Sequence, residues 1–414
     1  LDLAHAEDRA FIDALVDSEP NRLGAAFREA LYRRTGGHAL FSTELLRGLQ
    51  ERGDLVRDSE GCWMEGSVLD WNSLPKRVEA VIAAHIARLS REEQELLSVA
   101  SVEGEEFHAE VAARVLQADE RQVLASLSGA IGQEQRLVRA ESLRRIGEQR
   151  FSRYRFRHYL FQRYLYQRLD PVRRAYLHGE VGVALEGLGG VASGGPNAMD
   201  SASLLADTGE DLRRFPEGIV SETQLAWHWE KAGLAEKAAH YHMLAGRRAI
   251  YFSFSFDDML SHYVQALHLL STLPDNPRRT HWEQVGYQTL GVLLAKTKGW
   301  MIPEVGQAFR KSLELAEQIG EGPLLAEALT WMAYFHRSGG ELETALELGR
   351  RAVQLAQSGP PEWAMSQQRE LARTLQLHGD FGASARLLGP HAEALLRAGS
   401  LLLRDSTNHV AYNP

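Results

Sequence analysis

The chain has 414 residues, with 46 lysines and arginines against 55 aspartates and glutamates, which gives a formal net charge of −9. This charge argues against a protein that holds nucleic acid through overall positive charge. The single cysteine, Cys62, excludes an internal disulfide and is typical of a reducing compartment, so a cytoplasmic protein is expected. No run of about 18 apolar residues and no signal-peptide pattern occurs, so no membrane partner is expected.

Residues 1–75 are predicted to form a helical unit followed by a connector. Apolar residues recur at helical spacing through residues 1–57. Thr35-Gly36-Gly37 separates the last two expected helices, because glycine permits a sharp turn. A polar connector that contains tryptophan is predicted at 58–75. Since the chain opens directly into helix-like sequence, we expect the natural protein to have further residues before Leu1.

Residues 76–170 have the pattern of a winged-helix domain. Amphipathic stretches predict helices up to residue 131, and Ser90 followed by Glu93 is the signature of a capped helix start. Alternating residues at 136–143 and 149–156 predict two strands around a polar turn. A further helix is expected to begin near His158. Helices, a β-hairpin and another helix in this order are typical of a winged helix.

Residues 171–218 form a predicted bridge, with a helix from Pro171 to Leu188 and a glycine-rich flexible stretch after it. Residues 219–396 contain an internal repeat, and 397–414 form a tail. Small or apolar residues recur at the same offsets around three glycines, which are Gly233, Gly340 and Gly379. Stacked helical hairpins need a glycine at the turn and small residues where helices cross. The spacing looks like roughly five tetratricopeptide repeats, with an irregular helical bundle as the alternative.

The junction at His158 is the most informative chemical feature. A strand is predicted to end at Phe156 and a helix to begin near His158. The start of a helix favours an anion such as a phosphate, because its N–H groups are free and its dipole is positive there. The alternative is a histidine that is satisfied by local hydrogen bonds.

Two segments resemble the STAND family of signalling ATPases. The residues from Thr35 to Phe41, followed by Glu44-Leu45-Leu46, are similar to the Gly-Gly-Asn-Pro-Leu-Phe segment of the family's helical lid, with His38 in place of the asparagine and Ala39 in place of the proline. The His158 junction resembles the family's methionine-histidine-aspartate junction, with Arg157 and Tyr159 at the flanking positions. The order of lid, winged helix and tetratricopeptide solenoid is also the family's order.

The resemblance implies a mainly α fold, in which a helical lid and a winged helix precede an α-α superhelical tetratricopeptide solenoid. It also implies a nucleotide, ATP or ADP, in the intact parent protein. The residues that would face it are Gly37, His38, Ala39, Arg157 and His158. The parent would supply an N-terminal ATPase core and would oligomerise on activation.

This chain alone is expected to have no enzymatic activity and no cofactor. It lacks the Gly-x-x-x-x-Gly-Lys-Ser/Thr loop that cradles phosphates, so we expect neither hydrolysis nor tight binding of ATP. His228, His240 and His242 are close in sequence, but no metal-binding motif accompanies them. No nucleophile occurs in a recognisable catalytic context.

Two surfaces could contact partners. Residues 136–174 carry 12 arginines, no lysines and 3 acidic residues, and they could grip DNA, face the nucleotide, pair with acids of the ATPase core or form a solvated face. Aromatic residues crowd the first repeats, where they could pack in the core or form a concave surface for an effector. The predicted effector surface consists of Trp227, Trp229, Tyr241 and Tyr251.

We therefore expect a non-catalytic regulatory arm of a bacterial signalling or transcription regulator. Its solenoid would bind a protein or small-molecule effector and control the nucleotide switch. The alternatives are a winged-helix regulator that binds DNA directly and a tetratricopeptide scaffold that holds partner proteins.

Overall fold

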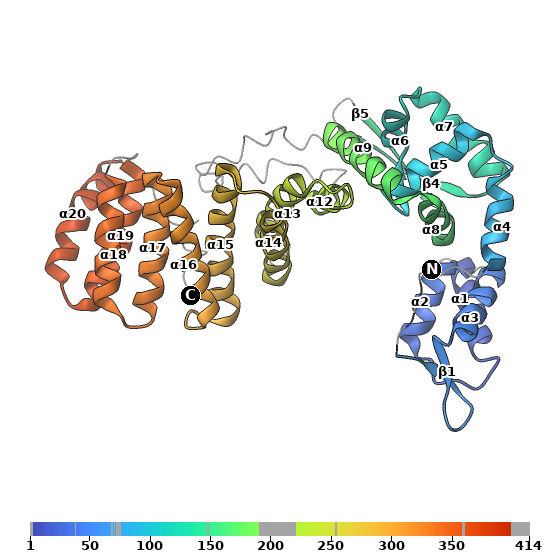
Figure 1. The fold of residues 1–414 in the computed structure, drawn as a ribbon, viewed down its shortest axis with the longest axis horizontal. Coiled ribbons are helices and arrows are strands. Elements are labelled where there is room, and N and C mark those ends of the chain that lie inside the picture. The colour runs from blue at the N-terminus through green and yellow to red at the C-terminus, as the bar shows by residue number, and fades with distance from the viewer. Residues whose placement is uncertain are drawn as a thin grey trace. The chain divides into compact units, whose positions relative to one another are not determined.

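The computed structural model describes residues 3–37, 39–67, 69, 71, 76–146, 149–189, 221–252, 255–357 and 361–398. The chain divides into two compact units, of which the first comprises Leu1–Val191 with Lys231–Gly233 and the second comprises Ala192–Glu230 with Leu234–Pro414. The predicted mainly α fold is confirmed, since helices dominate both units (Figure 1). Among the described helices, none combines the length and the apolar character that crossing a bilayer requires.

The first unit begins with a helical subdomain and a small hairpin. Its elements are α1 (Leu3–Val16), α2 (Ala25–Thr35), α3 (Ala39–Arg52), β1 (Leu55–Arg57) and β2 (Trp63–Glu65). A core cluster that includes Ile12, Phe27 and Leu45 joins the three helices. The sequence predicted helix up to residue 57 and a polar connector at 58–75, but β1 and β2 pair antiparallel, with Arg57 opposite Trp63.

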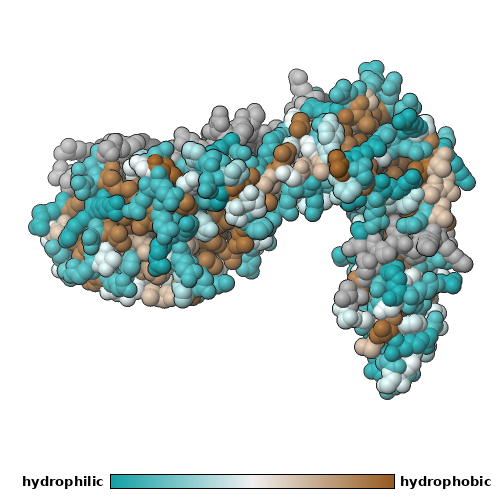
Figure 2. All heavy atoms as spheres, in the orientation of Figure 1, coloured by the Kyte–Doolittle hydropathy of each residue, from teal (hydrophilic) through white to brown (hydrophobic). Residues whose placement is uncertain are grey.

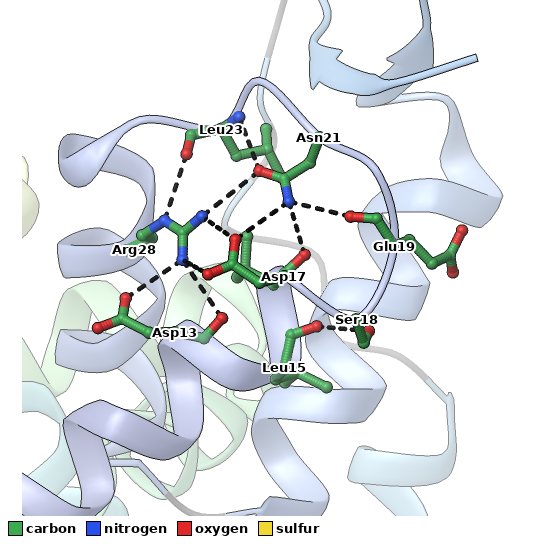
Figure 3. A network of polar contacts seen from close by, with 9 residues as sticks. Asp13, Leu15, Asp17, Ser18, Glu19, Asn21, Leu23 and Arg28 are labelled. Carbon is green, nitrogen blue, oxygen red and sulfur yellow. Dashed lines mark hydrogen bonds and ion pairs between the residues drawn. The ribbon is translucent and has the colours of Figure 1, made fainter.

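A polar network fixes α1 against α2 (Figure 3). The guanidinium of Arg28 on α2 donates to Asp13 at 3.3 Å and to Asp17 at 3.1 Å, both at or just after the end of α1. It also lies 3.5 Å from the side-chain oxygen of Asn21. The hydrogen bond from Arg28 lowers the pKa of the Asp17 carboxyl. This network sets the direction of α2 and therefore the position of the turn at its end.

The rest of the first unit builds a three-stranded antiparallel sheet with helices around it. The elements are α4 (Lys76–Ile86), α5 (Arg91–Glu103), β3 (Glu106–His108), α6 (Ala109–Leu116), α7 (Glu120–Ser128), a π-helical turn (Ala130–Glu134), β4 (Val138–Ile146), β5 (Gln149–Phe156), α8 (Tyr159–Arg168) and α9 (Pro171–Gly189). The strands lie in the order β3-β5-β4. The predicted capping box is confirmed, because the Ser90 hydroxyl accepts from the Glu93 N–H and the Glu93 carboxylate accepts from the Ser90 N–H.

The element order agrees with the prediction, and the short strand β3 is the element that it missed. Both predicted strands of the hairpin are present, although β4 extends to Ile146, beyond the predicted end at residue 143. Phe107 of β3 packs on Tyr154 and Phe156 of β5, with ring centroids 6.1 and 5.2 Å apart. These contacts attach the hairpin to the helices.

The second unit is a solenoid of stacked helices. Its elements are α12 (Glu222–Lys231), α13 (Ala235–Phe252), α14 (Phe256–Ser271), α15 (Pro277–Lys298), α16 (Pro303–Ile319), α17 (Gly322–Ser338), α18 (Leu342–Ala356), α19 (Pro361–His378) and α20 (Phe381–Ala398). The helices α15 to α20 stand side by side in antiparallel pairs (Figure 1). The three predicted glycine turns are confirmed, because Gly233, Gly340 and Gly379 all have positive φ between two helices.

Glycines also let the helices of the solenoid approach one another. A Cβ atom at Gly291 of α15 would lie 2.6 Å from the ring of Phe309 on α16. A Cβ atom at Gly246 of α13 would lie 2.9 Å from the ring of Tyr263 on α14. Each pair places a large ring directly on a glycine. The second pair shows that α14 is a full member of the solenoid, where the sequence indicated only a weak repeat.

Candidate functional site

The two segments that carry the family resemblance meet within the first unit. The helix α2 ends at Thr35, and Gly36 and Gly37 follow with φ values of 57° and 75°. A Cβ atom at Gly36 would lie 3.2 Å from Nδ1 of His158 and 3.9 Å from the carbonyl oxygen of Arg157. Gly36 is therefore required both by its left-handed backbone and by the close approach of the His158 ring.

Hydrogen bonds hold the Gly36 turn in place. The Gly36 N–H donates to the Tyr32 carbonyl at 2.7 Å and closes α2. The Thr35 hydroxyl donates to the Leu31 carbonyl at 2.9 Å and accepts from the Ser42 hydroxyl at 2.8 Å. Thr35 and Ser42 are both fully buried. This pair ties the end of α2 to the first turn of α3 on either side of the two glycines.

His158 is the N-cap residue of α8, as the sequence predicted. Its backbone is extended and its side chain does not cap the helix, so the ring turns toward other groups. The ring lies 5.2 Å from the ring of Phe41 in an edge-to-face arrangement and 5.5 Å from that of Phe161. Phe41 is the last residue of the lid-like segment and belongs to α3. The site therefore consists of a glycine turn, an imidazole and two aromatic rings.

Two arginines lie on α2 and α8, the helices next to the Gly36 turn and His158. Desolvation lowers the pKa of Arg34, on the last turn of α2, and the charge of Arg163 on α8 lowers it further, although Tyr159 acts in the opposite direction. The guanidinium of Arg34 lies 4.9 Å from the centre of the Trp71 ring, and Arg163 donates to the Tyr159 hydroxyl at 2.9 Å. Arginine is suited to bidentate contacts with phosphate and carboxylate groups.

Arg34 and Arg163 were not predicted as site residues. Arg34 directly precedes the Thr35-Gly36-Gly37 segment, and Arg163 lies in α8, which begins just after His158. An arginine next to each motif is the signal that could have identified them.

The other predicted residues of this site have different positions. Ala39 begins α3 and is exposed. Arg157 is exposed, and its Nε donates to the Val138 carbonyl at 3.3 Å. Gly37 is buried within the turn. His38 lies outside the described residues.

The predicted effector surface requires a correction. Trp229 is 1% exposed and Tyr241 is 8% exposed, so both belong to the core of the solenoid. Trp229 also carries the ammonium of Lys237 over its ring at 3.8 Å. Trp227 is 39% exposed and could contact a partner. The side chain of Tyr251 lies outside the described residues. Large aromatic side chains bury a large apolar area when they pack in a core, and this favourable burial explains why Trp229 and Tyr241 lie inside.

The positive charge of the β4–β5 hairpin is partly neutralised by glutamates of the first unit. Arg153 contacts Glu106 at 3.0 Å, and Arg155 contacts Glu105 at 3.2 Å and Glu106 at 3.3 Å. Arg144 and Arg150, near the tip of the hairpin, are exposed. Exposed arginines therefore occur near the tip, and also at Arg136 and Arg157, next to the two ends of the hairpin.

Among the described residues, one group of three possible metal ligands lies close together: Asp58, Glu60 and Cys62. Arg22 contacts Asp58 and Glu60, each at 2.7 Å. The Asp58 carboxylate also accepts from the N–H groups of Glu60 and Cys62. Its oxygens are used to fold the β1–β2 turn, which gives this group a structural role.

No protein-family model and no curated protein matches the sequence. Among solved structures, the chain is similar to the STAND protein with a tetratricopeptide repeat sensor from Pyrococcus horikoshii, with a TM-score of 0.32 and 13% identity. That similarity covers 94% of this chain and 60% of the Pyrococcus chain, so this chain spans less than two thirds of its length. BtubC from P. vanneervenii is similar with a TM-score of 0.27 and 13% identity, over 59% of this chain and 94% of that chain.

Proposed function

We propose that this chain is the non-catalytic regulatory and sensor arm of a nucleotide-dependent signalling protein. One observation carries the proposal: the Gly36 turn and His158, which are far apart in sequence, meet in the first unit. Arg34 on α2 and Arg163 on α8 are close enough to influence each other, and these two helices are in contact. A turn that admits a close ligand, a histidine at a helix start and two arginines are the groups that a diphosphate needs.

In this proposal the first unit closes over the phosphates of ADP in the intact protein. His158 would donate one hydrogen bond to a phosphate oxygen, and Arg34 and Arg163 would neutralise charge. The phosphates of the bound nucleotide would distinguish two states of the protein. The closed state would hold them, and the open state would not. This chain contributes binding and orientation, while a phosphate-binding loop would have to come from elsewhere in the protein, since the sequence has none.

The solenoid would act as the sensor in this scheme. An effector that binds it can shift the switch only if its affinity differs between the closed and the open state. The winged helix would transmit that difference to the junction at His158. Cytoplasmic location and oligomerisation on activation belong to the same proposal.

The test uses a protein that carries this chain together with a phosphate-binding loop. The variant His158→Ala should release a fluorescent ADP analogue about ten- to a hundredfold faster, because a hydrogen bond to a charged group contributes roughly 1.5–3 kcal/mol. His336→Ala, on the solenoid, is the matched control and should leave the release rate unchanged. Equal release rates for wild type and His158→Ala would overturn the proposal.

A further inference from the structure

The described part of the solenoid contains a groove of about 450 Å³ that no sequence pattern indicated. Three consecutive helices form it. Apolar side chains line most of it, and they come from α14, α15 and α16: Leu260, Val264, Leu290, Leu294 and Ala308. This volume falls in the range of pockets that hold small organic ligands.

The floor of the groove is preformed. Leu260 and Leu290 pack against a core cluster that contains Leu294 and Phe309. Because these residues are held by the core, a ligand would not need to order them on binding. Val264 is 50% exposed, although its neighbours on the groove wall are apolar. Figure 2 shows hydrophobic residues at the surface of the solenoid among hydrophilic ones. Covering the apolar wall would be favourable.

The rim of the groove is more basic than acidic. Lys298, on the last turn of α15, and Lys311, on α16, both line it. The one acidic residue of the lining, Glu304, lies in the first turn of α16, where the helix dipole favours a carboxylate. Lys311 contacts Glu314 at 3.3 Å, but both side chains are exposed and such pairs contribute little. The lining therefore carries two lysine ammoniums against one carboxylate, on a chain whose net charge is −9.

We propose that this groove binds a small anionic amphiphile. Its aliphatic or aromatic body would lie against Leu260, Val264 and Leu290, and its carboxylate or other anionic head would lie between Lys298 and Lys311. The inference rests on the proposed function only in treating this ligand as the effector. The lysines set the sign of the head group, and the groove volume matches that of a small molecule.

Isothermal titration calorimetry on the whole chain tests the proposal with decanoate as the probe. Decanoate should bind saturably with a dissociation constant below about 1 mM. Decyltrimethylammonium, which has the same chain and the opposite charge, should bind at least tenfold more weakly. Equal affinities for the two probes would show that the lysines do not select the ligand, and absence of decanoate binding would exclude the site.

Variants at exposed positions locate the site without disturbing the fold. Replacing both rim lysines, Lys298→Gln with Lys311→Gln, should weaken decanoate binding at least tenfold. Arg310→Gln removes the same charge one residue away, outside the groove lining, and should change the affinity less than twofold. Val264→Asp should also weaken binding, whereas Val172→Asp on α9 should not. An equal loss in the control variants would show non-specific binding and overturn the proposal.

Failure of this site and failure of the proposed function give different results. If decanoate binds as expected but does not change ADP release in the intact protein, the binding site is supported and its role as a sensor is contradicted. If decanoate does not bind while His158→Ala still accelerates ADP release, the binding site is contradicted and the nucleotide switch is supported.

Discussion

In the first unit, the Gly36 turn and His158 belong to segments that are far apart in sequence, and each occurs once. In the solenoid, each glycine turn joins two helices that pack on their sequence neighbours, and the arrangement recurs. Repeated local contacts tolerate the loss of one member, because stability is shared among neighbouring repeats. A unique junction has no such reserve, which is the property that a switch requires.

The largest effect is expected from removing a large buried ring of the solenoid core. Phe309 is 1% exposed and lies 5.9 Å from the Trp331 ring. Phe309→Ala should destabilise the second unit by about 3–5 kcal/mol. Hydrogen exchange should become faster in α15 to α17, while the first unit stays protected. Phe256→Ala, at a position that is 43% exposed, is the control and should change little. Uniform loosening of the whole chain would contradict the division into two units.

The second prediction concerns a buried carboxyl in the solenoid. Burial raises the pKa of Glu327 on α17 to about 7, although hydrogen bonds from Trp331 and Gln288 oppose the rise. The folded state therefore binds this proton more tightly than the unfolded state does. The tighter proton binding stabilises the folded state. This stabilisation is fully present below the pKa of the unfolded state, near 4.5, and is lost as the pH rises through about 7.

The loss should amount to no more than about 3 kcal/mol, because part of Glu327 still reaches solvent. Denaturant unfolding of the second unit at pH 5 and pH 8 measures it. Glu327→Gln, which keeps a neutral side chain of the same shape, should reduce the pH dependence. Glu347→Gln on α18, which is exposed, should leave the pH dependence as in the wild type. If the pH dependence of stability is unchanged in Glu327→Gln, another titrating group must cause it.

The difference between the two regions also explains what the sequence could predict. The offsets around Gly233, Gly340 and Gly379 indicated the helical pairs, because the contacts that stabilise a solenoid are local and leave a periodic pattern. The short strands β1, β2 and β3 were missed, since three residues are too few for an alternation to show. Trp229 and Tyr241 were misassigned because aromatic residues at helical spacing look alike whether they are buried or exposed.

The junction was predicted only in part. Glycines and a histidine at a helix start can be seen in the sequence, and the family resemblance suggested that they act together. The approach of Arg34 to Arg163 depends on how α2 packs on α8, which no spacing along the chain encodes. Long-range packing also buried the predicted Gly37 and exposed the predicted Arg157.

The third prediction concerns two glycines of similar backbone, one at the junction and one away from it. Gly36 has φ of 57° and lies against His158, whereas Gly53 has φ of 80° and nothing near its Cβ position. Alanine at either position should cost about 1–2 kcal/mol from the left-handed backbone. Gly36→Ala should cost more, because His158 must also move. Urea unfolding of the first unit measures both variants, and equal losses would show that the contact with His158 contributes nothing.

The smallest effect is expected for the arginines of the β-hairpin. On neighbouring strands, Arg153 lies diagonally from Glu106, two register positions from Arg155, which pairs directly with Glu106. The side chains of Arg153 and Glu106 are each 37% exposed, and their charged atoms are 3.0 Å apart. A double-mutant cycle with Arg153→Ala and Glu106→Ala should give a coupling of about 0.2–1 kcal/mol. A measurable coupling would assign this arginine to holding β3 against β5. If the coupling is absent and Arg153→Ala instead weakens binding to duplex DNA, with an affinity that falls steeply as salt increases, the hairpin serves a nucleic acid. The DNA-binding alternative would then replace the regulatory arm proposed for this chain, because the positive charge would be directed at a partner outside the unit.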